Sequence, residues 1–413
     1  MSASRPSLLR RHLAFRRLWL SWCVSNVADS MLFLVLAVWV KDLTGSNGAA
    51  AMTFVCFGAP ALIAPVLGDM VDRVSRRRLL VVVKLAIVPV LLGLLVVPDA
   101  VLLVAVYAVT VAYGAVGYLT AAAQGGLVRD LLDDDDLAAG NGLLSTVDQA
   151  LRLVAPLLGT GLYALAGPGP VVVLTASCFG VAALILAGLR MTETPPTPAD
   201  ERGGYGAEIV AGAAHLRRTP LLGITLVAVT VGFAATGLLN AVSFAVLEHG
   251  LGVPAAMIGL VVSVQGIGAV LAGITVARAI GTWQESAVVR VGLLLLAAGT
   301  LPLMTPWLPV ALVGLVAIGF GGTWSVVALM TMRQRLTPPT LQGRVGTATN
   351  VAITVPQTAV TLVGAALVGL VDHRLLLLVT AVGVALAAML TWRRTSSTVT
   401  GFTAQPQQQE AVS

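Results

Sequence analysis

Charged residues are scarce in this sequence: 11% of its 413 residues are Asp, Glu, Lys or Arg, whereas 57% are hydrophobic. A soluble domain carries about 25% charged residues, and even a large hydrophobic core needs a charged shell around it. The mean hydropathy is +0.93. The shortage of charge therefore excludes a soluble protein and predicts an all-α membrane protein whose surface mostly meets hydrocarbon.

Cysteine and histidine are also rare, which limits the chemistry. The three cysteines, Cys23, Cys56 and Cys178, have no C-x-x-C spacing, and the four histidines are scattered, so neither a disulfide framework nor a metal site is predicted. The acidic run DLLDDDD (130–136) lacks the glycine and the final glutamate of an EF-hand loop, and we expect a solvated loop there. Phosphate-binding and nucleophile-elbow motifs are missing. We therefore expect no enzyme, no metal and no cofactor.

Long apolar runs dominate the rest of the sequence. A membrane-spanning helix needs about 20 mostly apolar residues. The stretches that meet this rule number about twelve, and they are 18–40, 49–69, 79–97, 100–122, 142–166, 171–189, 221–246, 255–277, 287–305, 308–330, 347–371 and 374–392. The first is too long for the apolar part of a signal peptide, so we expect it to remain in the protein.

The basic residues indicate how these spans are oriented. The net charge is +6, but its arginines form short clusters between apolar spans, which is typical of cytoplasmic loops and not of a nucleic-acid surface. The opposite set of loops holds only Lys41 and Arg374. Both termini are therefore predicted to be cytoplasmic. The preference for arginine, together with abundant Ala, Val and Gly, hints at a bacterial protein and hence at the bacterial cytoplasmic membrane.

The longest polar interruption, 192–206, divides the spans into two sets of six. The expected parts are an N-terminal bundle (1–190), a cytoplasmic linker with a short amphipathic helix (191–219), a C-terminal bundle (220–394) and a disordered cytoplasmic tail (395–413). Corresponding residues of the two halves, such as Gly68 with Gly273 and Arg73 with Arg278, lie 205 positions apart. This spacing indicates two bundles related as parallel repeats.

The stretch GDMVDRVSRRRLL (68–80) concentrates charge between the second and third spans. Asp72 follows the C-terminal end of a helix, where the helix dipole disfavours an anion, so it needs a positive partner. The N-terminus of the eleventh span, near Arg344, enters from the same side and can provide one. We expect this contact to hold the two halves together on the cytoplasmic side; the alternative is that the arginines only fix the orientation. The residues assigned to this gating loop are Gly68, Asp72, Arg73, Arg76, Arg77 and Arg344.

The pattern G-x-x-x-D-R-x-x-R-R at 68–77 resembles the signature loop of the major facilitator superfamily, although Ser75 stands where a second glycine is common. Three further segments, 127–156, 208–222 and 336–350, resemble the drug:proton antiporter branch that includes macrolide and siderophore exporters. The resemblance covers nearly the whole chain. It implies a monomer with two pseudo-symmetric six-helix bundles that rock around a central site.

Ionisable groups inside the membrane are costly to bury and are therefore functional candidates. Asp29 is the clearest, since it lies roughly 16 Å into the first span at about 1.5 Å per residue, near the middle of the bilayer. Trp22, Asn26 and Phe33 lie on the same face of that helix. We expect Asp29 to take up and release a proton; the alternative is a structural acid bonded to a neighbouring helix.

The fifth span carries a second charged pair, Asp148 and Arg152, one helical turn apart. An ion pair at this spacing reduces the cost of burying both groups, and a proton relay is the alternative to simple pairing. The segment that follows, with Ala155, Pro156 and Gly159, resembles the antiporter motif of the fifth span and predicts a kinked helix. One glycine of that motif is replaced here by leucine.

The resemblance further implies that spans one, four, seven and ten line a central cavity. Aromatic and polar side chains on these spans, and on spans eight and eleven, are candidate substrate contacts, although aromatics at helical spacing also occur as ordinary packing. The candidates are Trp22, Asn26, Asp29, Phe33, Tyr107, Thr110, Phe233, Asn240, Phe244, Gln265, Phe320, Trp324 and Gln357. This set is apolar, aromatic and weakly acidic, which favours lipophilic neutral or cationic cargo.

Taken together, these features predict a proton-coupled exporter of small lipophilic compounds such as antibiotics, which works by alternating access and is driven by the proton gradient. Asp29 is expected to carry the proton, with Asp148 and Arg152 relaying or balancing it. The alternatives are a lipid or lysolipid flippase, an importer on the same fold, or a membrane sensor or scaffold that moves no cargo. The expected partners are the substrate, protons and membrane lipids, and no nucleic acid.

Overall fold

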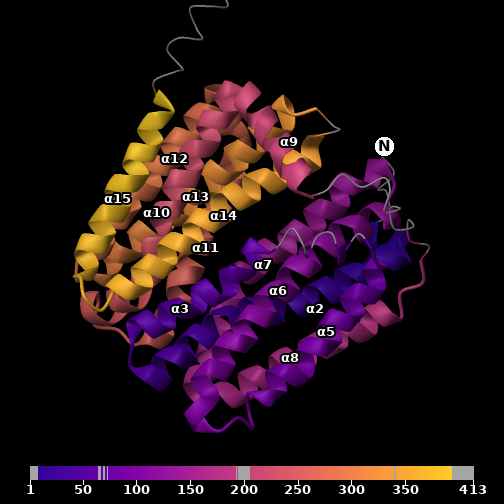
Figure 1. Ribbon diagram of the computed structural model, residues 1–413, viewed down its shortest axis with the longest axis horizontal. Helices are drawn as coiled ribbons and strands as arrows, with labels where there is room; N and C mark the ends of the chain where they lie inside the picture. Colours follow the sequence, from indigo (N-terminus) through magenta and orange to yellow (C-terminus); the bar gives the residue numbers. More distant parts are fainter. Residues whose placement is uncertain are drawn as a thin grey trace, which may run out of the picture.

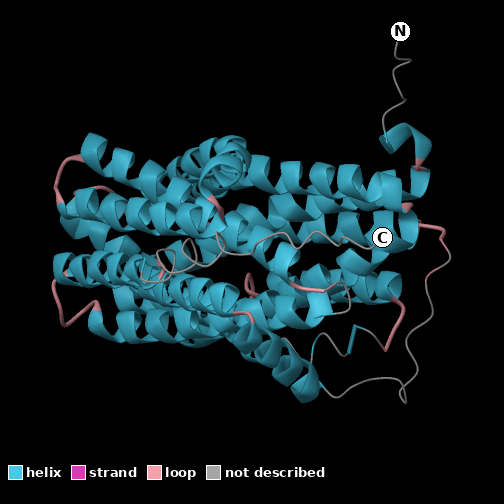
Figure 2. Cartoon of the chain, turned by 90° about the horizontal axis from the view of Figure 1, so that it is seen from above, coloured by secondary structure: helices cyan, strands magenta, loops and turns pink. Residues whose placement is uncertain are grey.

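The computed structural model describes residues 8–63, 67, 70–71, 73–191, 193, 205–338 and 341–392. These residues form helices joined by short turns, and no strand occurs among them. The helices run side by side along the long axis of the molecule (Figure 2). In Figure 1 they gather into two bundles, one coloured indigo to magenta and the other mostly orange to yellow. The prediction of an all-α fold with two helical bundles is confirmed.

The first bundle contains the helices of the N-terminal half, preceded by the one-turn helix α1 (Leu8–Arg11). Its long helices are α2 (Leu13–Thr44), α3 (Asn47–Gly58) with the short η1 (Ala59–Leu62), α5 (Arg76–Gly93), α6 (Asp99–Leu131), α7 (Asp134–Ala166) and α8 (Pro168–Ala187). Helix α2 packs against α7 and α8, and α5 packs against α6 and α8. Helix α2 is therefore at the centre of this bundle, which explains why most of its second half is buried.

The second bundle follows the linker helix α9 (Tyr205–Arg218). Its helices are α10 (Pro220–Ala245) with the π-helical turn η3 (Val246–Gly250), η4 (Ala255–Met257), α11 (Ile258–Trp283), α12 (Glu285–Thr300) with η5 (Leu301–Met304), α13 (Leu308–Leu336), α14 (Gln342–Leu367) and α15 (His373–Leu390). One continuous hydrophobic core runs through this bundle, from Leu222 to Ala388.

Each of the twelve predicted spans coincides with a helix. Among the described residues, nine helices are long and apolar enough to cross a membrane by length and composition alone. The other three are shorter or carry charge: α3 with η1, α5, which begins with three arginines, and α7, whose apolar part is limited to Leu153–Ala166. All three pack in the first bundle beside three of the nine, and the other six form the second bundle. The protein is therefore a multi-pass membrane protein.

The acidic run 130–136 is largely helical, so the prediction of a solvated loop is wrong for most of it. Helix α6 continues to Leu131, and α7 begins at Asp134. Acidic residues at a helix N-terminus are favoured by the helix dipole. Asp136 also pairs with the N-terminal segment, since its Oδ1 lies 3.2 Å from Arg11 Nη2 and its Oδ2 lies 3.0 Å from His12 Nε2.

Glycines set the packing within the second bundle. A Cβ atom placed on Gly292 of α12 would lie 2.7 Å from the carbonyl oxygen of Gly321 on α13, and one on Gly299 would lie 2.6 Å from that of Gly314. Because these positions lack side chains, the two helices approach backbone to backbone. Any larger residue there would separate α12 from α13.

Among the described residues, the two bundles contact each other mainly through three helix pairs, which are α7 with α11, α3 with α14 and α3 with α10. A Cβ on Gly48 would lie 2.6 Å from the Ala365 carbonyl oxygen, and one on Gly259 would lie 2.7 Å from that of Pro156. These contacts are near the end of the molecule where α2 and α10 end, which we call the distal end. The other end, where α2 begins and α9 lies, carries Arg76 to Arg78 and is called the arginine-rich end. The ribbons of the two bundles diverge towards the arginine-rich end (Figure 1).

Candidate functional site

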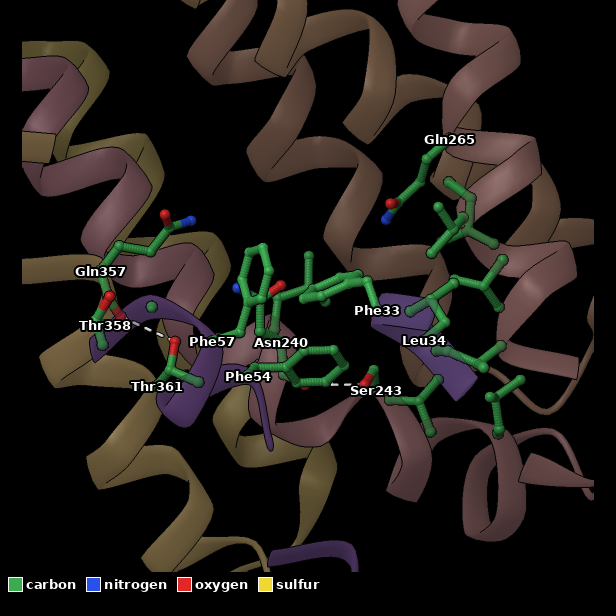
Figure 3. Close-up of a pocket in the computed structure, with 18 of the residues that line it drawn as sticks. Phe33, Leu34, Phe54, Phe57, Asn240, Ser243, Gln265, Gln357, Thr358 and Thr361 are labelled. Atoms are coloured by element: carbon green, nitrogen blue, oxygen red, sulfur yellow. Dashed lines mark hydrogen bonds between the residues drawn. The ribbon is translucent and has the colours of Figure 1, made fainter. Parts of the chain in front are cut away.

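A cavity of about 300 Å³ lies between the two bundles (Figure 3). Helices α2, α3 and α6 line it from the first bundle, and α10, α11, α13 and α14, with the short η3 and η5, line it from the second. On the first-bundle side, Phe33 packs against Phe54 and Phe57 with ring centroids 5.3 Å and 4.7 Å apart. Most of the remaining wall is aliphatic. Among the described residues that line the cavity, none is Asp, Glu, Lys, Arg or His, so the wall carries no formal charge.

Neutral polar groups from the second bundle complete the wall. Thr354, Gln357, Thr358 and Thr361 of α14 line the cavity, and Figure 3 shows the last three on one side of it. The Thr358 and Thr361 hydroxyls donate hydrogen bonds to carbonyl oxygens of their own helix, both at 2.9 Å. Their oxygen lone pairs remain open to a ligand. This face therefore accepts hydrogen bonds more readily than it donates them.

Two amides provide donors as well as acceptors. Asn240 of α10 and Gln265 of α11 both line the cavity, and their side-chain amides have no hydrogen-bond partner among the described residues. The Gln357 amide, in contrast, donates a bond of 3.0 Å to Thr236 Oγ1. An unpaired amide in an apolar wall is costly unless a ligand or water satisfies it. Asn240 and Gln265 are therefore the polar groups best placed to recognise a ligand.

The distal end of the cavity is closed by contacts between the bundles. Lys41 Nζ, at the end of α2, lies 2.7 Å from Glu248 Oε2 in the π-helical turn that continues α10. Nearer the cavity, the fully buried Phe244 ring stacks on Phe54 with centroids 6.2 Å apart. Lys41 also donates to the Gly45 carbonyl at 2.9 Å. One ion pair and one aromatic pair thus connect the bundles at this end.

A second group of candidate residues lies inside the first bundle. Asp148 Oδ1 of α7 accepts hydrogen bonds from Trp22 Nε1 and from Asn26 Nδ2 of α2, each at 2.8 Å. The sequence placed these residues in two separate clusters, and the structure brings them together. Asp29 lies one turn further along α2, and its carbonyl oxygen accepts a bond of 2.9 Å from the Tyr113 hydroxyl. The side chain of Arg152 lies outside the described part of the chain.

The described residues of the gating loop are tied to their own bundle. Arg76 pairs with Asp130 at 3.4 Å, and Arg77 Nη1 donates to the Leu189 carbonyl at 2.7 Å. The Ser75 hydroxyl bonds Glu193 Oε1 at 2.7 Å, which attaches the loop to the segment after α8. Arg73 lies in the turn between η1 and α5. Gly68, Asp72 and the side chain of Arg344 lie outside the described residues, so their predicted contact stays a prediction.

Of the remaining candidates, Phe33, Asn240, Gln265 and Gln357 line the cavity, and Phe244 borders it. The others make helix-packing contacts. Tyr107 donates to the Ala49 carbonyl at 2.8 Å, and the buried Thr110 donates to a carbonyl of its own helix. Phe233 and Phe320 pack against the core of the second bundle. The rings of Phe320 and Trp324 contact each other there, with centroids 4.8 Å apart.

The predicted kink motif of the fifth span forms helix contacts in α7. Ala155 is buried, and Pro156 lies inside the helix, with its carbonyl facing Gly259 of α11. A Cβ on Gly159 would lie 3.0 Å from the Met31 Cα atom of α2. The motif therefore brings α7 close both to α2 and to the second bundle.

Sequence reasoning missed several residues of the site. Phe54 and Phe57 were part of the second span, and their i, i+3 spacing on one helix face was the available signal. The threonines of α14 follow the same helical periodicity, at i, i+4 and i+7. Lys41 and Lys84 were also missed, and the available signal was that they are the two lysines of the chain and that each one lies in or beside a span.

Within the described residues, no group of His, Cys, Asp and Glu is arranged to hold a metal ion.

A multi-pass helical protein with a cavity between two bundles has the architecture of a membrane transporter. Residues 18–250, more than half of the chain, match the family model described as Major Facilitator Superfamily. The chain belongs to the major facilitator superfamily, and it is a membrane transporter of that fold. No curated protein matches it.

Solved structures agree with this fold over nearly the whole chain. The nucleoside transporter NupG matches with a TM-score of 0.74 and 13% identity, over 92% of this chain and 99% of that chain. A bacterial homologue of the iron transporter ferroportin in its inward-facing state matches with a TM-score of 0.71 and 16% identity, over 94% and 99%. The same homologue in its outward-facing state matches with a TM-score of 0.62 and 18% identity, over 93% of this chain and 99% of that chain. At these identities the likeness concerns the fold alone.

Proposed function

We propose that the protein is a proton-coupled exporter of small, neutral lipophilic compounds, in the drug:proton antiporter branch of the superfamily. The observation that carries this proposal is the uncharged cavity between the bundles, with phenylalanine rings on one wall and neutral polar groups on the other. An ionic cargo would lose its hydration in such a cavity without a counter-charge. The cavity therefore favours neutral over cationic cargo.

In this proposal the protein is a monomer in the bacterial cytoplasmic membrane, and the arginine-rich end faces the cytoplasm. The positive-inside rule supports this orientation, which leaves both termini cytoplasmic. The distal end then faces outwards and is closed by Lys41 and Glu248. The cavity would load from the cytoplasm in this state.

Asp29 carries the proton in this scheme, with Asp148 and Arg152 balancing the charge. Three contacts of α2 support it. Asp148 is bonded to Trp22 and Asn26 on the same helix as Asp29, and Phe33, one turn beyond Asp29, lines the cavity. A change in the charge of either acid would therefore act on the helix that contacts the cargo. Protonation and cargo binding can be coupled in this way without direct contact.

The gating loop closes the cytoplasmic side in the alternate state of this scheme. Its ties to Asp130, Leu189 and Glu193 hold the loop on the first bundle, so that Asp72 can meet the N-terminus of α14 when the bundles rock. The arginines also suit anionic lipid headgroups at the inner surface. Asp72→Asn is expected to slow transport without changing membrane insertion.

The proposal can be tested with two fluorescent compounds, neutral Nile red and cationic ethidium. Bacterial cells that express the protein should accumulate several-fold less Nile red than cells with an empty vector, and a protonophore should abolish the difference. Asp29→Asn should behave like the empty vector at equal amounts in the membrane. Glu285→Gln, which removes an ion pair with Arg335 inside the second bundle, is the matched control and should remain active.

The alternatives give different results in the same cells. Nile red efflux that persists with a protonophore would reject proton coupling. Movement of a labelled lysolipid in place of Nile red would identify a flippase, and binding of Nile red by the purified protein without any flux would identify a sensor. Efflux of ethidium in preference to Nile red would reject the argument from the uncharged cavity.

A further inference from the structure

Lys84 of α5 is buried in the interior of the first bundle. The residue is 2% exposed, and its Nζ atom has no hydrogen-bond partner among the described residues. A buried amine within a membrane span is costly, and such a residue is rarely retained for packing alone. An apolar side chain of similar length, such as methionine, would fill the same space without this cost. The position of Lys84 therefore calls for an electrostatic partner.

The surroundings of Lys84 lead to Asp29 through a chain of contacts. Lys84 Nζ lies 5.6 Å from the centre of the Phe179 ring of α8. That ring packs edge-on against Tyr113 of α6 with centroids 6.4 Å apart, and the Tyr113 hydroxyl donates to the Asp29 carbonyl at 2.9 Å. Four helices thus place Lys84 and Asp29 around one aromatic cluster. Lys84 and Asp29 lie at the two ends of one chain of contacts that runs through Phe179 and Tyr113.

We propose that Lys84 is the counter-charge of Asp29, and that release of the Asp29 proton depends on it. This inference rests on the proposed role of Asp29 as the proton carrier. An isolated carboxylate in a dry interior is unfavourable, and a neighbouring cation offsets part of that cost. Without Lys84, Asp29 would hold its proton and resemble the neutral variant Asp29→Asn. Lys84 is thus a positioning residue for the coupling step.

Other titratable groups around Asp29 act differently. Tyr113 of α6 donates to the Asp29 carbonyl, and Asp148 of α7 is bonded to Trp22 and Asn26 on the helix that carries Asp29. Asp148 has the same charge sign as Asp29 and therefore disfavours a second carboxylate nearby. Phe179 on α8 is apolar. Lys84 on α5 is thus the cation that balances this group of acids among the described residues.

The same cluster reaches the cavity. The Tyr113 ring lies 5.4 Å from the ring of Phe57, which lines the cavity and packs against Phe33. When Asp29 takes up a proton, its charge attraction to Lys84 is lost, and with it the electrostatic link between α2 and α5 through the cluster of Phe179 and Tyr113. Loss of this attraction can change the positions of the Tyr113 and Phe57 rings, and Phe57 lines the cavity where the cargo would bind. Lys84 would then couple proton binding to the shape of the cavity.

The test compares four purified variants: Lys84→Met, Asp29→Asn, their combination, and Arg290→Met. Arg290 is the matched control, because its guanidinium lies 5.0 Å from the Trp392 ring in the second bundle, away from these acids. Infrared difference spectroscopy follows the carbonyl stretch of a protonated carboxylic acid as the pH rises, and the band absent from Asp29→Asn belongs to Asp29. In Lys84→Met the midpoint of that band should move to higher pH by about one unit or more, a tenfold change in proton affinity.

Each result decides a separate question. A midpoint that is the same in Lys84→Met and the wild type would overturn the inference, as would an equal shift in Arg290→Met. If Lys84→Met does not fold, the combined variant with Asp29→Asn should recover thermal stability, and failure to recover it would also reject the pairing. The spectroscopic result is independent of transport. Absence of proton-driven Nile red efflux by the wild type would instead overturn the proposed function and leave the charge pair standing.

Discussion

The ion pair between Lys41 and Glu248 gives the sharpest test of how the distal end is held closed. Glu248→Gln keeps the shape of the side chain and removes its charge. The amide can still reach Lys41, but the charge attraction between the two bundles is lost. We expect the variant to populate the state that is open at the distal end more often than the wild type does.

The structure sets the size of this effect. The Lys41 and Glu248 side chains are 8% and 29% exposed, so the pair is intermediate between a fully exposed and a fully buried ion pair. An exposed pair contributes about 0.2–1 kcal/mol, while removing one partner of a buried pair costs about 3–5 kcal/mol. Lys41 keeps its bond to the Gly45 carbonyl, which reduces the penalty. We therefore expect a loss of about 1.4 kcal/mol, or a tenfold shift in the population ratio.

Spin labels at positions 96 and 370 provide the assay. Val96 and Leu370 are 82% and 83% exposed at the distal end, one in each bundle, so labels there should not disturb packing. The native cysteines are first replaced by alanine. Pulsed electron resonance in lipid nanodiscs then measures the distance between the labels.

The ratio of long to short distances should rise about tenfold in Glu248→Gln. The control Glu285→Gln breaks an ion pair with Arg335 that lies within the second bundle, and its distances should match the wild type. Identical distance distributions for Glu248→Gln and the wild type would refute the role of this pair in closing the distal end.

Three further predictions follow from single contacts. Asn240→Leu removes an unpaired amide from the cavity wall and should weaken the binding of a hydrogen-bonding ligand. The expected loss of binding free energy is about 0.5–1.5 kcal/mol, obtained from the Kd in a fluorescence titration. Unchanged affinity would exclude this amide as a contact. Gly259→Val should cost about 1–3 kcal/mol of stability in thermal melts, because its Cβ would lie 2.7 Å from a carbonyl of α7. Gly273→Ala on the same helix meets open space and should melt like the wild type. Trp22→Phe keeps a ring but removes the 2.8 Å bond to Asp148, and proton-driven efflux should slow; an unchanged rate would exclude this bond from coupling.

Much of the fold could be predicted because hydrophobic length is a local property. Each predicted apolar run coincides with a helix. The cavity residues Phe33, Asn240, Gln265 and Gln357 were predicted from the family resemblance, which implies the lining spans, together with the positions of aromatic and polar side chains on the helices. The ends of the helices were less predictable. Helix α7, for example, begins with acidic residues that lower the hydropathy of its first turns but suit a helix N-terminus.

The partners of the charged residues could not be predicted. The bond from Trp22 to Asp148 joins residues 126 positions apart, and nothing local indicates it. Lys84 was read as part of an apolar span, because one lysine hardly changes the hydropathy of a whole helix. The Phe320 and Trp324 pair has the same helical spacing whether it lines a cavity or packs in a core. Only the arrangement of the neighbouring helices decides between the two.

Proton movement caused by cargo is the most direct test of the scheme. Vesicles reconstituted with the purified protein and loaded with a pH-sensitive dye receive Nile red on one side, with no gradient present at the start. The wild type should move protons in the direction opposite to Nile red, and Asp29→Asn should transport Nile red downhill without any pH change inside. Equal pH changes in the two proteins would contradict the assignment of Asp29 as the proton carrier.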